Sequence, residues 1–400
     1  MDGHGDADDL ARGSFRSSLK ELSVEREPAA VNKLWREFYM VVLWISAILF
    51  LIFGHGWVAQ ARGAFAFALF AWLFLLILWS AFGVVRHAEE IAERLGEPFG
   101  TLVLTLAVTA IEVAFIVTAM LNGPAGSTLA RDAVFAVVMI TLNGVAGFSL
   151  LAGALRHREQ SISMAGIQAF LAVLIPLASF ALILPNFTTS TPGPTLSSTQ
   201  AIVIGALTLL LYGVFLSMQT VRHRGFFTEP GEETWNTSPD DASHARKGHG
   251  RTMAFHAVAL LLTLVPVVYL AEELSHIVRY GIAAIGAPRP VAGVLIAVLV
   301  LAPESMGAFR AALANRPQRA VNIALGSALA TIGLTIPAVL AVRVATGIPV
   351  ALGLEAEEMV LLVVTFVVSM ITFAGGRTNV LLGAVHAVMF LVFVLLLFDP

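Results

Sequence analysis

Long runs of apolar residues, separated by short polar segments, occupy most of the chain. A helix needs about 20 apolar residues to cross the hydrocarbon core of a bilayer. Runs of suitable length are predicted at residues 38–54, 64–85, 100–121, 133–155, 163–185, 201–219, 252–271, 290–313, 320–343, 357–374 and 378–398. The pattern therefore predicts an all-α polytopic membrane protein with about eleven transmembrane helices.

The composition supports this class. Hydrophobic residues make up 58% of the chain and charged residues 13%, against about 45 to 50% and 25% in soluble domains. The mean hydropathy is +0.84. The lipid bilayer is thus the expected partner, and a net charge of −3 gives no reason to expect nucleic acid. Because the chain has no cysteine, disulfides, thiolate metal sites and a cysteine nucleophile are excluded.

The basic residues predict which side of the membrane each polar segment faces. Residues 1–37 are polar without a short apolar core, which is typical of a cytosolic tail and not of a cleavable signal peptide. If the N-terminus is cytosolic, all but five of the 24 Lys and Arg residues lie in cytosolic segments, as the positive-inside rule requires. The exceptions are Arg62, Arg131, Arg279, Arg289 and Arg343. We expect a plasma membrane protein, in a bacterium an inner membrane protein, with its C-terminus outside.

Two glutamates lie deep inside predicted spans. Glu304 follows Pro290 by fourteen residues, and Glu112 follows Pro98 by fourteen. At ~1.5 Å per residue this is about 21 Å along a helix, within a hydrocarbon core about 30 Å thick. An acidic side chain at that depth costs about 2.5 to 3.5 kcal/mol, and such residues usually serve an ion, a proton or a partner.

A proline beside the second glutamate adds a possible ligand. Pro303 has no N–H, so the carbonyl of Leu299 lacks its normal helical donor. A freed carbonyl close to a carboxylate offers hard oxygen ligands to a cation.

The surroundings of the two glutamates are also duplicated. Ala88-Glu89-Glu90 precedes the first copy, and Ala271-Glu272-Glu273 precedes the second. The helix after each glutamate carries small and polar residues, Leu142-Asn143-Gly144 in one copy and Leu325-Gly326-Ser327 in the other. An odd number of helices per copy predicts two inverted five-helix repeats with a site at the membrane midplane between them. Glu89, Glu90, Glu272 and Glu273 then line mouths on opposite faces, or are solvated charges at helix ends.

This organisation divides the chain into segments. After the tail comes an extra first helix with its loop at 38–63, and the two halves are 64–219 and 253–400. Residues 220–252 form a cytosolic linker rich in Gly, Pro, Ser and balanced charge, which predicts a flexible connection. A metal sensor built on its histidines is the alternative. In the first case, a Gly/Ser segment in place of residues 225–248 leaves transport nearly unchanged.

The motif regions resemble a known family. The stretches GEPFGTLVLTLAVTAIEV and LAPESMGAFRAALANRPQRAVNIALGSALATIGLTIP are similar to the calcium/cation exchanger superfamily, and within it to the bacterial calcium/sodium/potassium:proton antiporter branch. The resemblance spans about residues 64–398. It implies that Glu112 and Glu304 are the essential acidic positions and that Asn143, Gly144, Gly326 and Ser327 lie in the partner helices. It also implies exchange of cytosolic cations for protons by alternating access.

The chain departs from the superfamily in the residues before each glutamate. Relatives often carry polar residues there, whereas the first copy has only Thr109 and the second reads Val300-Leu301-Ala302-Pro303. Fewer side-chain oxygens leave room for Na⁺ or K⁺ beside Ca²⁺. Hard oxygen ligands do not favour a thiophilic metal.

The expected function is a secondary cation:proton antiporter that exports Ca²⁺, Na⁺ or K⁺, with no cofactor. The chain lacks a nucleophile elbow, His-Glu-x-x-His and a phosphate-binding glycine loop, so no enzyme is expected. His256, His276 and His386 are interpreted as structural residues near helix ends. A sodium/calcium exchanger without protons, a cation channel and a structural membrane protein remain alternatives, and the oligomeric state is left open. The expected cation and proton site comprises Glu112, Glu304, Asn143, Ser327, Thr109 and the Leu299 carbonyl.

Overall fold

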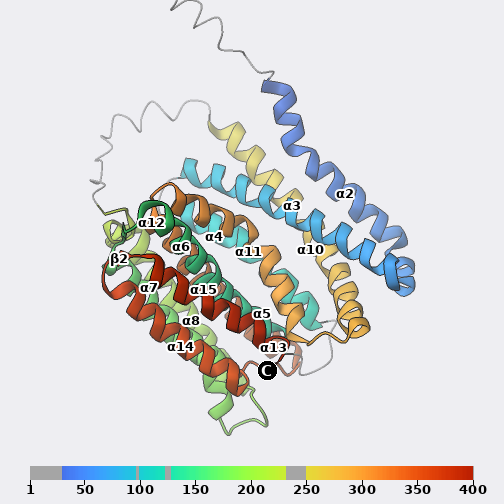
Figure 1. Cartoon of the computed structure of the whole chain (residues 1–400). Coiled ribbons are helices and arrows are strands. Elements are labelled where there is room, and N and C mark those ends of the chain that lie inside the picture. Colours follow the sequence, from blue (N-terminus) through green and yellow to red (C-terminus); the bar gives the residue numbers. More distant parts are fainter. Residues whose placement is uncertain (1–28, 96–98, 122–127, 231–248, 400) are drawn as a thin grey trace, which may run out of the picture.

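The computed structural model describes residues 29–95, 99–121, 128–230 and 249–399, and within them the protein is almost entirely helical (Figure 1). The first half follows an extra helix, α2 (Ala29–Gln60), and contains α3 (Gly63–Leu95), α4 (Phe99–Leu121), α5 (Leu129–Met139), η1 (Ile140–Val145), α6 (Ala146–His157), β1 (Gln160–Ser161), α7 (Met164–Ala178), η2 (Ser179–Ile183), η3 (Leu184–Phe187), α8 (Ser198–Ser217), η4 (Met218–Arg222) and η5 (Arg224–Phe227). The second half contains α10 (His249–Ile285), α11 (Pro290–Leu313), α12 (Pro317–Ala330), η6 (Thr331–Thr335), α13 (Ile336–Thr346), α14 (Ala356–Ala374), β2 (Arg377–Thr378) and α15 (Val380–Leu396).

These elements form the eleven predicted helical rods. Where α5, η1 and α6 follow one another without a break they count as one rod, as do α12, η6 and α13. In the described residues, nine rods are long and apolar enough to cross a membrane, and two shorter apolar helices lie at Leu106–Thr118 and Val380–Leu396. The predicted fold class is therefore confirmed.

Three helices are markedly longer than the apolar pattern indicated, and one of them, α3, continues past 85 to Leu95. Helix α2 begins at Ala29 instead of 38, so the end of the expected tail is helical, while residues 1–28 lie outside the described residues. Helix α10 continues past 271 to Ile285. Leu274, Ile277 and Val278 are buried in this extension, at the spacing of one helical face. Polar residues between these buried positions interrupt the apolar run, so the apolar pattern did not predict this amphipathic continuation of the helix.

The two halves share an unusual feature. The third rod of each half is interrupted by a π-helical turn, η1 in the first and η6 in the second. Such turns are rare and are frequent at functional sites. Their matching positions support the predicted duplication.

A short β-ladder shows that the halves are inverted. Strand β1 follows the third rod of the first half, β2 follows the fourth rod of the second, and Gln160 pairs with Thr378 in an antiparallel ladder. Successive connections alternate between the ends of a helical bundle. The connection after the third rod of one half and the connection after the fourth rod of the other would lie at opposite ends if the halves ran in the same direction. They meet at one end, so the halves run in opposite directions.

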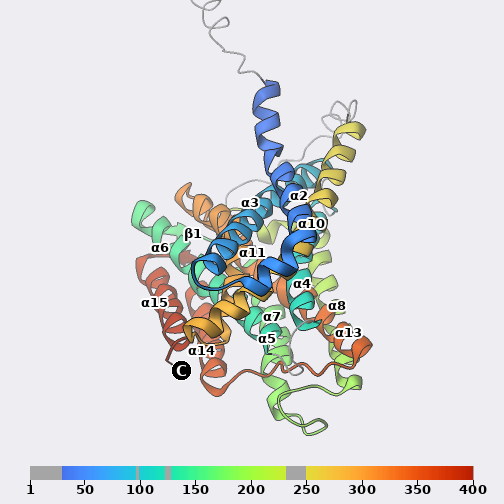
Figure 2. The same cartoon turned by 90° about the vertical axis from the view of Figure 1, so that its right-hand side faces the viewer.

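Two further contacts of connecting segments join the two halves, one at each end of the bundle. At the end with the ladder, the Asn322 amide donates to the Phe227 carbonyl over 2.6 Å. At the other end, Asn186 donates to the Leu354 carbonyl over 2.8 Å. Figures 1 and 2 both show the start of α2 at one extreme of the molecule and the end of α15 towards the other.

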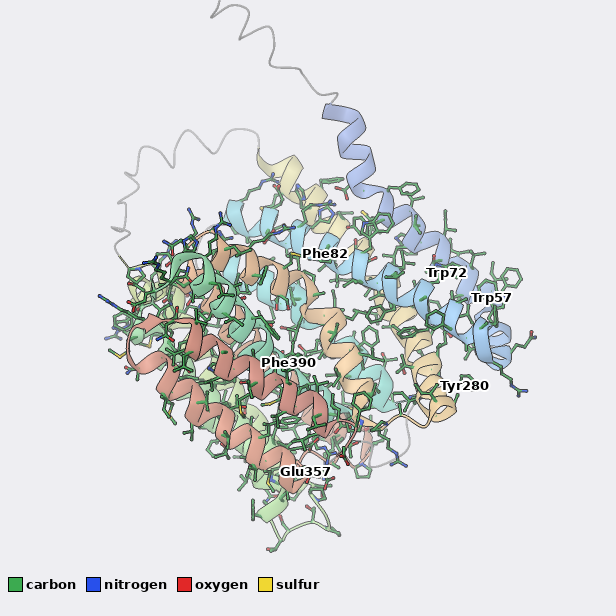
Figure 3. All side chains as sticks on the ribbon, in the orientation of Figure 1. Trp57, Trp72, Phe82, Tyr280, Glu357 and Phe390 are labelled. Carbon is green, nitrogen blue, oxygen red and sulfur yellow. The ribbon has the colours of Figure 1, made fainter. Side chains whose placement is uncertain are left out.

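The extra helix α2 packs on α3 and α10 along one flank. Phe50 lies against Trp57 and Trp72, with ring centroids 5.3 and 5.5 Å away, and Figure 3 shows the two tryptophans together on this flank. Nearer its start, Tyr39 lies so close to Gly83 that an added Cβ would come within 2.2 Å of the Tyr39 ring. Glycine at 83 therefore allows this contact between α2 and α3.

Candidate cation site

The second and third rods of the two halves meet in the interior. Helix α11 packs on α5, η1 and α12, and α4 packs on η6, α5 and α11. Glu112 lies on α4 and Glu304 on α11, so the two carboxylates come from corresponding rods of the inverted halves. Both carboxylates are bound by hydroxyls of the same rod, α12 with η6.

Glu112 is held by the opposite half. Its side chain is only 3% exposed. Thr331 donates its hydroxyl to one carboxylate oxygen over 2.8 Å, and Thr335 donates to the other over 3.2 Å. Both threonines lie in η6 and are buried, so both carboxylate oxygens have a hydroxyl donor inside the protein.

Glu304 is held within its own half. It accepts a short hydrogen bond from the Ser327 hydroxyl on α12. Unlike Glu112, Glu304 is partly exposed, and so is Ser327. The two carboxylates therefore have different surroundings, although their sequence contexts are duplicated.

One helix serves both carboxylates. Ser327, Thr331 and Thr335 occur at every fourth residue, the spacing that brings side chains to one face of a helix. Ser327 contacts Glu304, and the two threonines contact Glu112. The sequence interpretation included Ser327 but missed the threonines, although a hydroxyl at every fourth position of an otherwise apolar span was visible.

Asn143 lies in η1, the counterpart of η6. Along the chain, Asn143 follows Glu112 as Thr335 follows Glu304. Its amide nitrogen donates to the Thr365 hydroxyl over 2.9 Å, and its oxygen lies 3.0 Å from His386 Nδ1. Both ends of this amide are thus engaged by α14 and α15. When the two π-helical turns are matched, Asn143 corresponds to Thr335. The sequence interpretation had paired Asn143-Gly144 with Gly326-Ser327, which lies about two turns earlier in the same rod.

The two expected glycines lie in the partner helices, in contact with aromatic rings. A Cβ on Gly144 would lie 3.2 Å from the ring of Phe390 on α15, a residue labelled in Figure 3, and one on Gly326 would lie 3.9 Å from Phe170.

Two further expected ligands are buried near the glutamates. Thr109 is 5% exposed and precedes Glu112 by less than one turn of α4. Leu299 is 1% exposed, and α11 runs through Pro303 as a continuous helix. Because Pro303 has no N–H, the Leu299 carbonyl still lacks its regular helical donor.

The four expected mouth residues have different surroundings. Glu89 is exposed on α3, and Glu90 forms an ion pair with Arg94 at 3.0 Å. Glu272 is partly exposed, whereas Glu273 is 7% exposed and accepts a hydrogen bond from Tyr269 over 3.3 Å. Because α10 extends to Ile285, Glu272 and Glu273 lie inside that helix and not at its end. Their role as a mouth stays a prediction.

The histidines are not equivalent either. His256 is 2.9 Å from His87 between their Nδ1 atoms, His276 is partly exposed near Arg279, and His386 is fully buried. In the part of the chain that the structure describes, no group of three or more His, Cys, Asp and Glu could hold a metal ion. Residues 231–248 of the linker, where a metal sensor was the alternative, lie outside the described residues.

Comparisons with known proteins agree with this arrangement. The sequence profile described as sodium/calcium exchanger protein matches the chain twice, at residues 65–221 and at residues 255–398. Each match covers one five-helix half, which is the duplication seen in the site.

Individual relatives cover most of the chain. The putative ionic transporter y4hA of Sinorhizobium fredii is 45% identical over 80% of this chain and 86% of its own length. The sodium-potassium/proton antiporter ChaA of Escherichia coli is 38% identical over the same shares.

Solved structures show the same fold. Native YfkE aligns with a TM-score of 0.67 at 20% identity, covering 90% of this chain and 100% of that one. The H⁺/Ca²⁺ exchanger CAX aligns with a TM-score of 0.64 at 15% identity, covering 90% and 88%.

Proposed function

Because the chain belongs to the sodium/calcium exchanger protein family, we propose that it exchanges cytosolic cations for protons at a site formed by Glu112 and Glu304. The family is one of transporters, so the chain is a transporter and not an enzyme. The relative at 38% identity is named a sodium-potassium/proton antiporter, which supports proton exchange in this chain.

One observation carries the assignment of the site. A single helix face with Ser327, Thr331 and Thr335 donates hydrogen bonds to both glutamates, one from each inverted half. A carboxylate that only tied two helices together would not need a counterpart at the same place in the other half. The shared face supports one site with two carboxylates over two separate structural residues.

The residues also support competition between cations and protons. Two nearby carboxylates in a low-dielectric interior cannot both stay charged without a counter-charge. A bound cation supplies that charge, and when it leaves protons take its place. The hydroxyls are able to turn, so each can donate to a carboxylate or accept from a protonated one and offer its oxygen to a cation.

The inverted halves support alternating access. Glu304 is partly exposed and Glu112 is buried, so access differs between the two sides of the site. In inverted-repeat transporters, motion of one half against the other changes which side is open. Such a motion would exchange the accessibility of the two carboxylates.

The ligands favour a hard cation. Carboxylate, hydroxyl and carbonyl oxygens suit Ca²⁺, Na⁺ and K⁺, whereas sulfur ligands suit thiophilic metals. The chain has no cysteine, and the site contains three hydroxyls. We therefore propose Na⁺, K⁺ or Ca²⁺ as the exported ion.

Flux through purified protein in proteoliposomes tests the proposal. An imposed pH gradient should drive uptake of Na⁺, K⁺ or Ca²⁺, and a gradient of the same cation should move protons in the opposite direction. Cation flux that needs Na⁺ on the other side but ignores the pH gradient would instead establish a sodium/calcium exchanger without protons. Transport of zinc or copper alone would contradict the proposal.

A further inference from the structure

A buried histidine lies beside the candidate site. His386 on α15 is 0% exposed, and both of its ring nitrogens are engaged. Nδ1 lies 3.0 Å from Asn143 Oδ1, and Nε2 lies 3.1 Å from the Thr372 hydroxyl. An ionisable residue inside a membrane span is uncommon and usually functional. The two partners of His386, Asn143 and Thr372, are neutral side chains, so an ion pair does not explain why a histidine is buried at this position.

Close helix packing fixes the position of this ring. A Cβ added to Gly147 on α6 would lie 2.7 Å from the Cβ of His386. One added to Gly383 on α15 would lie 2.5 Å from the backbone nitrogen of Leu151. The backbones of α6 and α15 are therefore in contact, and His386 has little freedom to move relative to η1.

The hydrogen bonds give the Asn143 amide one orientation. Because Asn143 Oδ1 can only accept, His386 Nδ1 must donate to it. Asn143 Nδ2 donates to the Thr365 hydroxyl. The turned amide would need the other tautomer of His386, with its proton on Nε2 towards Thr372, so the tautomer of His386 and the orientation of the amide are fixed together. The oxygen keeps a second lone pair, since His386 uses only one.

The same position in the other half is part of the site. Thr335, the counterpart of Asn143, donates to Glu112, and η1 packs on both α11 and α12. By the duplication, Asn143 stands in the first half where Thr335 stands in the second, and the orientation of its amide would decide whether oxygen or nitrogen is presented to a cation from this position.

The fold itself does not require a histidine at this position. Gly205 on α8 faces Pro337 and Leu340 of α13, as Gly383 on α15 faces Leu151 of α6. Three residues further along each helix stand Thr208 and His386, and both are buried. The first half packs with a threonine where the second half has the histidine.

We propose that His386 is a positioning residue, which orients the Asn143 amide so that its oxygen serves the transported cation. This inference rests on the proposed function. Through His386, α14 and α15 take part in cation binding although they carry neither glutamate.

A double-mutant cycle in proteoliposomes tests this role. His386→Leu removes the donor to Asn143 and should raise the KM for the transported cation roughly tenfold, as loss of a residue that orients a ligand commonly does. In the Asn143→Ala background, the same substitution should change KM less than about twofold, because residues that act through one contact are not additive. His386→Asn keeps a donor near the place of Nδ1 and should restore most of the affinity.

Two further variants test the other hydrogen bond of His386 and provide a control. Thr372→Val disturbs the other side of the ring and should raise KM in the same direction, by a smaller factor. Thr208→Val, at the corresponding position of α8, is the control and should leave KM unchanged. Heat stability in detergent is measured for each variant, so that loss of folding is separated from loss of affinity.

Three results would overturn the inference. Equal KM increases with and without Asn143 would mean that His386 acts elsewhere. A less stable His386→Leu protein with unchanged KM would mean a structural role. A shifted pH profile with unchanged KM would make His386 a proton carrier. Absence of any exchange by the unmodified protein would contradict the proposed function itself, so the two failures are distinguishable.

Discussion

At the scale of single residues, the site combines two carboxylates whose surroundings differ. Glu112 has two hydroxyl donors and is buried, whereas Glu304 has the Ser327 hydroxyl and is partly exposed. Duplicated sequence therefore does not give a symmetric site. Substitution of either glutamate should have the same effect on exchange, because binding of one cation needs both charges.

Glu112→Gln and Glu304→Gln should each abolish coupled exchange. Glutamine keeps the shape of the side chain but removes the charge that attracts the cation and the group that takes up the proton. A neutral amide also avoids the cost of a carboxylate inside the bilayer, so both variants should insert and be as heat-stable as the parent. Proton-coupled flux in proteoliposomes is the measurement.

Glu159→Gln is the control for that experiment. Glu159 is exposed and makes only a 3.5 Å contact with Arg377, so the variant should transport like the parent. Full exchange by Glu304→Gln would remove Glu304 from the mechanism. Aggregation of the glutamine variants would support a structural role.

Helix contact at Gly293 provides a stability prediction. A Cβ there would lie 2.6 Å from the nitrogen of Ala133 and 2.7 Å from the carbonyl carbon of Asp132. Since backbone atoms cannot move aside easily, Gly293→Ala should destabilise the protein by about 1 to 3 kcal/mol. Gly281 on α10 has nothing within 4 Å of the added atom, so Gly281→Ala is the matched control. Melting temperatures in detergent should fall for the first variant only.

At the scale of elements, a buried arginine connects the two halves at the end opposite the β-ladder. Arg131, at the start of α5, contacts Asp132 at 2.8 Å, the Gly353 carbonyl at 3.1 Å and Glu355 at 2.9 Å. Glu357, labelled in Figure 3, marks the same end of α14. Arg131 is one of the five basic residues on the side expected to be outside, and these contacts give it a structural reason to be there.

Arg131→Met should destabilise the protein strongly. It leaves the carboxylate of Asp132, which is 3% exposed, without its counter-charge, and breaking a buried pair costs about 3 to 5 kcal/mol. Arg377→Met removes an ion pair whose side chains are 73% and 63% exposed, which is worth at most about 1 kcal/mol. Thermal unfolding in detergent compares the two. Equal shifts would show that the Arg131 contacts do not hold the halves together.

At the scale of the whole molecule, residues 227 and 229, which follow α8, are attached to both halves. Phe227 packs on Phe170 with ring centroids 5.4 Å apart, and its carbonyl accepts from Asn322. Glu229 accepts from the backbone nitrogen of Arg319 over 3.0 Å, in the first turn of α12, where a carboxylate stabilises a helix. These residues belong to the folded protein, although the sequence interpretation placed them in the replaceable linker.

Linker replacement should therefore depend on where it begins. A Gly/Ser segment of equal length in place of residues 231–248 should leave transport nearly unchanged, since such chains only set reach. A replacement that begins at residue 225 removes the Phe227 ring, which packs on Phe170, and the Glu229 carboxylate, which accepts from Arg319, and should lower transport or stability. Flux assays of both variants decide this. Loss of activation by cytosolic calcium in the shorter replacement would show a sensor in the linker.

The proposed orientation is testable without a background signal, because the chain has no cysteine. Arg316 and Thr346 are exposed at opposite ends of the α12–η6–α13 rod. In intact cells, Thr346→Cys should react with a membrane-impermeant maleimide, whereas Arg316→Cys should react only after lysis. The reverse pattern would place the N-terminus outside.

Features that depend on local chemistry could be predicted from the sequence. Apolar length sets the number of spans, because backbone groups in lipid must pair within a helix. Equal spacing of Glu112 and Glu304 from their prolines revealed the duplication. These properties belong to single segments and do not require knowledge of which helices touch.

Which side chains meet could not be predicted from the sequence and follows from the packing of the helices. Thr331 and Thr335 reach Glu112 from the opposite half, and His386 reaches Asn143 across more than half of the chain. Such contacts depend on how each helix is rotated about its axis and on where glycines allow backbones to touch. An apolar span gives little information on either, because both its lipid-facing side and most of its buried side are apolar. The inversion, predicted from the odd number of helices per copy, was confirmed when β1 and β2 were found at one end of the molecule.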